Sequence, residues 1–299
     1  MNAQTSAATA ERILQRLDWQ VIRRLDGLLQ GDYRSLFYGY GVDFADLREY
    51  QAEDDIRYID WNVTARMDVP YVRQYVEDRE ITAWFLLDLS PSVDFGTTGS
   101  EKRLKLVEFV TTFARLLTRH GNRVGALFYG RGVERILPAR AGRLQVLRLA
   151  NDLLKQPRLS GLPMTDLSPL LRAALNALRK RSLVFVVSDF ISIPGWEKPL
   201  NLLNQRHEVV AIRLWDPREV DLPDVGPLIM EDAETGEQLY VDTRDRKFRR
   251  AFTELAKKRE QEMSTAFQRA GVDVMPLSTG DDLVRSIVRF AMLREQRRK

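Results

Sequence analysis

The chain of 299 residues is long enough for one large domain or two smaller ones with a hydrophobic core. Hydrophobic residues make up 44% and charged residues 29%, which is ordinary globular usage and excludes a disordered, collagen-like or coiled-coil protein. The absence of cysteine excludes disulfides, thiolate zinc sites and cysteine nucleophiles, so any metal must be held by oxygen or by the two histidines. A net charge of +4 is too small to indicate a nucleic-acid partner by itself.

The first 80 residues divide into two segments. Residues 10–30 carry apolar residues at helical spacing, which predicts an amphipathic helix within a first segment of residues 1–32. Residues 33–80 mix aromatic, β-branched and charged residues, which favours a small strand-and-loop subdomain. We expect a cytoplasmic protein, because the N-terminus lacks a secretion signal and no apolar run approaches the roughly 18 residues of a membrane span.

From residue 81 onward, short apolar runs alternate with longer helical patterns, which is typical of βαβ units. The apolar runs predict strands at residues 81–87, 123–129, 182–187, 208–214 and 272–276. The helical patterns predict helices at residues 101–120, 143–155, 167–180, 195–206, 244–270 and 281–294. A hairpin is expected at residues 227–231 and 238–242, with a turn through residues 234–237. The predicted fold class is α/β, with a doubly wound, mainly parallel sheet over residues 81–299.

Oxygen-bearing side chains follow the ends of the predicted strands. Asp88, Ser90 and Ser92 alternate along the turn after the first strand, so they share one side. Thr165 precedes a predicted helix, and Asp189 follows the third strand. In an open α/β sheet such loops meet at the crevice where ligands bind. Two carboxylates and three hydroxyls form a hard oxygen set that suits Mg²⁺ or Mn²⁺ rather than zinc.

This order of residues resembles the metal-ion-dependent adhesion site of von Willebrand factor A domains, with Asp88-x-Ser90-x-Ser92 followed by Thr165 and Asp189. The resemblance implies a von Willebrand factor A-like, Rossmann-type fold and an Mg²⁺ (or Mn²⁺) ion held by these five residues. On this hypothesis Ser90, Ser92 and Thr165 coordinate the ion. Asp88 and Asp189 supply charge directly or through water, and the exposed coordination position accepts an Asp or Glu of a partner protein.

The preceding segment resembles a narrower family, the domain-of-unknown-function family fifty-eight. The resemblance is carried by the stretches Gly41-Val-Asp-Phe-Ala-Asp-Leu-Arg48-Glu49-Tyr50, Asp54-Asp55-Ile-Arg57-Tyr-Ile-Asp60-Trp61 and Ala65-Arg66. It implies a MoxR-type AAA+ ATPase and other von Willebrand A proteins as candidate partners, and a role as adaptor or co-chaperone. The charged residues of this segment indicate either a salt-bridged surface, which we favour, or an interaction face. They are Arg48, Asp55, Arg57, Asp60 and Arg66, with Trp61 beside them.

Several single residues carry more modest expectations. Trp61 and Tyr50 are expected to be packing residues, because aromatic side chains dominate cores. His120 and His207 each end a predicted helix, which favours a capping or surface role over catalysis. Phe190 departs from the adhesion-site pattern, since many members carry glycine after the second aspartate.

Our preferred hypothesis is a non-enzymatic, metal-dependent protein-binding module, and two alternatives stay open. A metal-dependent hydrolase of phosphatase or esterase type would use the bound ion to activate water, although the sequence places no general base beside the loop. A nucleic-acid-associated scaffold would use residues 240–299, where fifteen Lys and Arg stand against nine Asp and Glu. Nucleotide hydrolysis is not expected, because the sequence has no Gly-rich phosphate loop with its lysine.

Overall fold

The structure, a computed structural model, describes residues 46–51, 56, 59, 61–67, 69–74, 81–97 and 99–298. It divides the chain into two compact units, one formed by Phe37–Glu80 and the other by the rest of the chain. The helix predicted at residues 10–30 lies outside the described residues. None of the helices in the described part is long and apolar enough to cross a membrane.

The smaller unit contains an antiparallel strand pair and one short helix. Strand β1 (Asp46–Glu49) pairs with β2 (Tyr71–Gln74), and helix α4 (Trp61–Met67) lies between them in the chain. The expectation of strands and loops alone is therefore wrong at α4. The alternation of apolar residues there is too short to distinguish strand from helix, and the last residues of α4, Ala65-Arg66-Met67, are good helix formers.

The larger unit is built on a six-stranded sheet with the order β10-β7-β6-β3-β4-β5. Its strands are β3 (Thr82–Asp88), β4 (Arg123–Tyr129), β5 (Val133–Arg140), β6 (Leu183–Ser188), β7 (Glu208–Trp215) and β10 (Asp273–Ser278). All neighbours run parallel except β5, which pairs antiparallel with β4 at the edge. The central strands are buried on both faces, as a parallel sheet between helices requires. The α/β prediction is confirmed, and the five predicted strands are present within two residues at each end.

Strand β5 is the strand of this sheet that the sequence did not reveal. Its side chains are largely exposed, with Leu137 as the buried exception, so no apolar run marks it. Pro138 and three charged residues suit an edge strand, where one side of the backbone faces solvent. The turn into β5 is closed by the Gly130 N–H, which donates to the Gly132 carbonyl at 3.1 Å.

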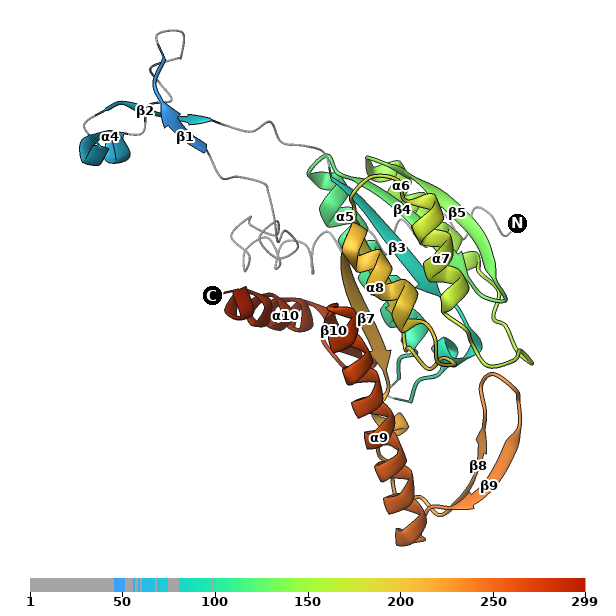
Figure 1. The fold of residues 1–299 in the computed structure, drawn as a ribbon. Helices are drawn as coiled ribbons and strands as arrows, with labels where there is room; N and C mark the ends of the chain where they lie inside the picture. Colours follow the sequence, from blue (N-terminus) through green and yellow to red (C-terminus); the bar gives the residue numbers. More distant parts are fainter. Residues whose placement is uncertain are drawn as a thin grey trace. The chain divides into compact units, whose positions relative to one another are not determined.

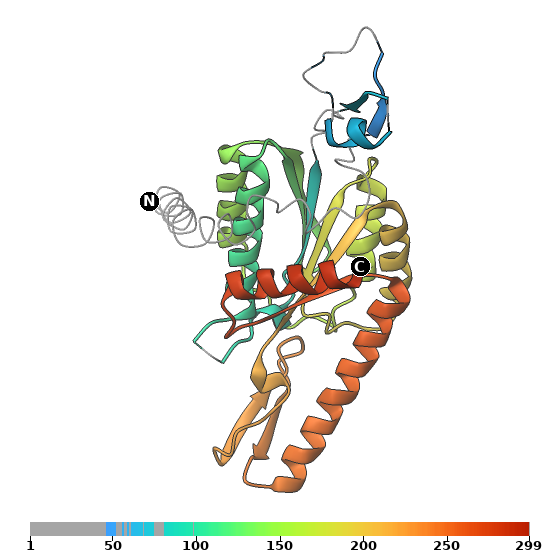
Figure 2. The ribbon, with the colours of Figure 1, turned by 90° about the vertical axis from the view of Figure 1, so that its left-hand side faces the viewer.

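Helices cover both faces of the sheet, which makes it doubly wound (Figures 1 and 2). Helices α5 and α6 pack together over one face, while α7, α8 and the C-terminal part of α9 pack in series over the other. Helix α10 packs against the edge strand β10. The helices are α5 (Lys102–Arg119), α6 (Arg143–Lys155), α7 (Ser168–Ala177), α8 (Glu197–Arg206), α9 (Arg246–Ala270) and α10 (Leu283–Arg298). The predicted helices of this region are thus confirmed.

A hairpin and the first part of α9 extend beyond the end of the sheet where the parallel strands finish (Figures 1 and 2). The hairpin strands, β8 (Pro227–Glu231) and β9 (Gln238–Asp242), have the predicted bounds. Asp245 caps the start of α9 by accepting a hydrogen bond from the Lys247 N–H at 2.8 Å. The hairpin therefore lies beside the carboxyl ends of the parallel strands, where the candidate site residues are.

Candidate functional site

The site lies where the strand order of the sheet reverses. Counted along the chain, the six strands have the spatial order 3-2-1-4-5-6, so the reversal falls between the neighbouring strands β3 and β6. Open α/β sheets bind ligands at the carboxyl ends of the strands at this switch point. Asp88 ends β3 and Asp189 follows β6, so both predicted carboxylates stand there. We call Asp88, Ser90, Ser92, Thr165 and Asp189 the strand-end site.

Asp88 is fully buried and organises the turn after β3. Its Oδ1 accepts a hydrogen bond from the Ser90 N–H at 3.0 Å, and its Oδ2 accepts one from the Ser188 hydroxyl at 2.6 Å. The Ser90 and Ser92 hydroxyl oxygens lie 3.1 Å apart, and Pro91 begins a short 3-10 helix, η3 (Pro91–Asp94). These contacts turn the three alternating side chains toward one point, as the sequence predicted.

Asp189 forms an ion pair with a buried lysine that the sequence analysis did not select. Its Oδ1 accepts the Ile191 N–H at 3.0 Å, and its Oδ2 accepts Nζ of Lys102 at 2.6 Å. Lys102 is 1% exposed and also donates to Glu219 at 2.5 Å. Burial disfavours the ammonium, but the charges of Asp189 and Glu219 raise the pKa of Lys102 above its usual value. Lys102 therefore stays charged and neutralises this side of the site.

Thr165 and Ser92 meet at a carboxylate from outside the predicted set. The Thr165 hydroxyl donates to Oε1 of Glu234 at 2.9 Å, and the Ser92 N–H approaches the same oxygen at 3.4 Å. Glu234 lies in the turn between β8 and β9 and is only 6% exposed. Its other oxygen, Oε2, is buried without a hydrogen-bond partner among the described residues. The structure thus gathers the strand-end site and adds one carboxylate to it.

Burial leaves negative charge at the site that the described residues do not fully neutralise. Burial and the nearby charge of Asp189 raise the pKa of Asp88 to about 6. Burial also raises the pKa of Glu234, although hydrogen bonds from Thr165 and Ser92 oppose that shift. Among the described residues, neither Asp88 nor Glu234 forms an ion pair. A nearby cation would therefore stabilise the ionised form of both carboxylates.

The donor chemistry fits a hard divalent cation. In the described part of the chain, no group of three or more carboxylates or imidazoles could hold a metal ion by itself. A cation here would depend on hydroxyl oxygens together with Asp88 and Glu234, and all-oxygen sets suit Mg²⁺ or Mn²⁺. The unpaired Oε2 of Glu234 is the kind of buried atom that such an ion satisfies.

A family profile described as "Protein of unknown function DUF58" matches residues 46–262. The chain belongs to this family. A relative that matches over nearly its full length, the uncharacterized protein Rv1480 of Mycobacterium tuberculosis, is 35% identical over 285 residues, which cover 95% of this chain and 89% of the relative. The uncharacterized protein MAV169 of Mycobacterium avium is 32% identical over 160 residues, covering 54% of this chain and 94% of that protein.

Solved structures resemble this DUF58 chain more distantly. Protein BatB of Bacteroides thetaiotaomicron is 11% identical, with a TM-score of 0.44, and the match covers 72% of this chain and 99% of BatB. The manganese-loaded TRAP protein of Plasmodium vivax is 18% identical, with a TM-score of 0.34, and the match covers 46% of this chain and 58% of that chain.

The charged segment that suggested the DUF58 family is only partly described. Arg48 lies in β1, while Trp61 and Arg66 lie in α4. Both α4 residues are exposed, and Trp61 is 69% exposed, so the expectation that Trp61 is a packing residue is wrong in the described structure. The remaining predicted members, Asp55, Arg57 and Asp60, lie outside the described residues.

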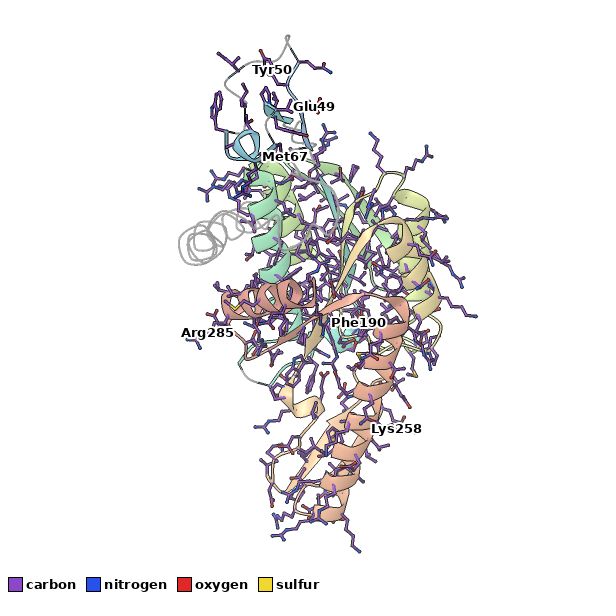
Figure 3. The ribbon with its side chains drawn as sticks, turned by 60° about the vertical axis from the view of Figure 1, so that its left-hand side comes forward. Glu49, Tyr50, Met67, Phe190, Lys258 and Arg285 are labelled. Carbon is purple, nitrogen blue, oxygen red and sulfur yellow. The ribbon has the colours of Figure 1, made fainter. Side chains whose placement is uncertain are left out.

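Phe190 shows what replaces the glycine that the adhesion-site pattern often has at this place. Its φ of 56° is in the left-handed region, where glycine is unstrained and other residues are uncommon. The ring contacts Trp196 and Phe267 at centroid distances of 5.3 and 4.8 Å, and Figure 3 shows it beside α9. Aromatic packing therefore holds a backbone conformation that is otherwise unfavourable.

Four residues of the site escaped the sequence analysis, namely Ser188, Lys102, Glu219 and Glu234. Lys102 had a usable signal, because it precedes Leu106 by four residues and so lies on the buried face of α5. Glu234 had none, since a glutamate in a hairpin turn with Thr235-Gly236 is typically solvated. His120 ends α5 and His207 ends α8, as expected, but His207 is buried at 4% exposure, so a surface role is wrong for it.

Proposed function

We propose that this chain is a non-enzymatic, metal-dependent protein-binding module that serves as adaptor or co-chaperone of a MoxR-type AAA+ ATPase. In this proposal the strand-end site holds Mg²⁺ or Mn²⁺, and a carboxylate of the partner binds the ion. Ser90, Ser92 and Thr165 coordinate the ion, with Asp88 and the lysine-paired Asp189 contributing negative charge.

The observation that carries the proposal is the convergence of buried oxygen atoms at the switch point of the sheet. Asp88 and Ser90 are joined by a hydrogen bond, Ser90 and Ser92 by another, and Ser92 and Thr165 share Oε1 of Glu234. Burying these oxygen atoms without a strong partner costs free energy of folding. A cation bound to them would offset that cost. The resemblance to adhesion sites and membership in DUF58 support the choice of partner.

The chain's own residues can provide a rigid receptor for a carboxylate. Hydrogen bonds from Ser90 N–H and Ser188 Oγ fix both oxygens of Asp88, so its orientation is set before any partner arrives. A bound cation would supply the positive charge that attracts an acidic side chain. Lys102 is already paired with Asp189 and Glu219, so it is not available for that task.

The test is capture of the cognate MoxR-type ATPase by the full chain with Mg²⁺ and after removal of divalent ions with EDTA. We expect EDTA, Asp88→Ala and the double variant Ser90→Ala/Ser92→Ala each to abolish capture. Asp221→Ala is the matched control, because it removes an exposed aspartate from the same unit. Unchanged capture by correctly folded Asp88→Ala protein, with or without EDTA, would refute the metal bridge.

The non-enzymatic part of the proposal has a separate test. We expect no metal-dependent turnover of phosphate esters or carboxylate esters above the level of the Asp88→Ala variant. Turnover that depends on Asp88 and on Mg²⁺ would instead support a hydrolase.

A further inference from the structure

Glu234 is remote in sequence from the strand-end site and yet lies inside it. Residues 69 and 142 positions away, Thr165 and Ser92, both hydrogen-bond its Oε1. The residue is only 6% exposed, and Oε2 has no hydrogen-bond donor among the described residues beside it. A purely structural glutamate would gain two contacts and leave one carboxylate oxygen buried and unsatisfied, which is costly.

The hairpin turn is built to hold Glu234 in this place. Oδ1 of Asp232 accepts hydrogen bonds from the N–H groups of Glu234 and Thr235 at 3.0 and 2.8 Å. The Glu234 carbonyl accepts the Leu162 N–H at 2.9 Å, which ties the turn to the loop that carries Thr165. Gly236, with a φ of 75°, supplies the left-handed residue of the turn. The backbone of Glu234 is therefore fixed from both sides.

We propose that Glu234 is the chain's own ligand for the divalent cation, and that it occupies the coordination position that a partner carboxylate would use. The inference rests on the proposed function, because it assigns the occupant of that same site. Oε1 remains hydrogen-bonded to Thr165 while Oε2 binds the ion. A second carboxylate beside Asp88 also balances the charge of a divalent ion, which neutral hydroxyls cannot do.

The surroundings of Glu234 define how a partner would compete with it. A cavity of about 500 Å³ lies between the hairpin, η3 and α9, and both Ser92 and Glu234 line it. Arg218 and Arg259 line the same cavity together with Glu219, Glu231 and Asp232, so its walls carry both signs of charge and it is the bound ion that would favour a carboxylate. A partner carboxylate entering there would displace only the side chain of Glu234 from the ion, because hydrogen bonds hold the backbone of the turn in place. The free chain is thus held in a self-occupied state.

The test uses Mn²⁺ as the probe, because water-proton relaxation counts the exchangeable waters on bound Mn²⁺. We compare the full chain with its Glu234→Gln variant, which keeps the shape and the Oε1 acceptor but is a poor ligand. The expected result is a Kd for Mn²⁺ raised at least about tenfold, with one additional water on the ion. Glu237→Gln, which removes an exposed charge from the same turn, should leave both quantities unchanged.

Acetate provides a second readout that does not depend on affinity for the metal. In the wild-type chain, acetate should leave the relaxation of bound Mn²⁺ unchanged, because Glu234 already fills the position. In Glu234→Gln, acetate should displace the additional water and lower the relaxation. Asp232→Ala, which loosens the turn without touching the carboxylate, should behave in the same direction.

The outcomes separate the inference from the function on which it rests. Equal Mn²⁺ affinity and equal water count in wild type and folded Glu234→Gln would overturn the inference and leave the metal site standing. Failure of the wild-type chain to bind Mn²⁺ at all would overturn both. Circular dichroism of each variant establishes that the fold is retained.

Discussion

The two sides of the strand-end site handle buried carboxylates in opposite ways. On the side of β6, Asp189 and Glu219 share the ammonium of Lys102, at 2.6 and 2.5 Å. On the side of the hairpin, Glu234 has hydrogen bonds at Oε1 but no partner among the described residues at Oε2. The first side is electrostatically closed, and the second is open to a cation. The difference fits a role for Lys102 in holding the fold and, on the proposed function, a role for Glu234 in binding the cation.

Removing the lysine should have the largest effect. Lys102→Met leaves Asp189 as an uncompensated buried charge, and such losses typically cost about 3–5 kcal/mol in the free energy of unfolding. Urea unfolding measures it. Adding Asp189→Asn should restore part of the loss, because the second change removes the stranded charge.

The control for this prediction is Lys198→Met, which removes an exposed lysine from the first turn of α8. It should change stability by no more than about 0.5 kcal/mol. If Lys102→Met were equally harmless, the closed side would not be held by its ion pairs, and the contrast between the two sides would disappear.

Asp216 shows a third way to bury a carboxylate, because hydrogen bonds from neutral donors alone satisfy both of its oxygens. It accepts hydrogen bonds from the hydroxyls of Thr97 and Thr279, both at 2.6 Å, and from the N–H groups of Thr97 and Arg218, both at 2.9 Å. Asp216→Asn should cost about 2 kcal/mol in urea unfolding, because the amide offers one acceptor oxygen where the carboxylate offers two. A loss near zero would contradict this account of the carboxylate.

The contribution of Asp216 to the free energy of unfolding should also depend on pH. Burial opposes ionisation, but the hydrogen bonds from Thr279 and Thr97 outweigh it and hold the pKa of Asp216 below its usual 3.8. As pH falls below that value, the unfolded chain binds the proton first, so this stabilisation is lost. The stability gap between wild type and Asp216→Asn should therefore narrow in acid, and a constant gap would contradict the assignment.

Phe190, which follows Asp189, offers a test with a smaller expected effect on stability. It asks whether ring packing holds the left-handed backbone at this position. Both Phe190→Ala and Phe190→Gly lose the ring that packs on Trp196 and Phe267, so both should destabilise the chain. With φ at 56°, however, Gly should be more stable than Ala by about 1 kcal/mol. Thermal or urea unfolding compares them, and a preference for Ala would show that the left-handed conformation relaxes once the ring is gone.

Sequence patterns predicted the core of this fold well, because buried parallel strands and amphipathic helices carry periodic apolar residues. The all-buried run of β6 and the apolar face of α5 are examples. The edge strand β5 and helix α4 were missed because their residues are mostly exposed and carry little periodicity. Strength of burial, rather than length of the element, decided what could be predicted.

The site was predictable only where motif residues follow strand ends. Asp88 and Asp189 could be placed because parallel strands finish at one edge of the sheet. Glu234 could not, since its position depends on where the β8–β9 hairpin folds back in three dimensions. Lys102 falls between these cases, as a charged residue at an apolar position of a helix.

The smallest expected change in stability is that of Glu234→Gln, on the side of the hairpin. The sign of this change matters more than its size. Without divalent ions, Glu234→Gln should leave stability unchanged or raise it by up to about 1 kcal/mol, because it removes a charge whose burial raises the pKa of Glu234. With Mg²⁺, binding stabilises wild type more than the variant, so the order should reverse. Urea unfolding in EDTA and in Mg²⁺ measures the change of sign. A Glu234→Gln variant that is markedly less stable in both conditions would show that Glu234, like Lys102, serves the fold.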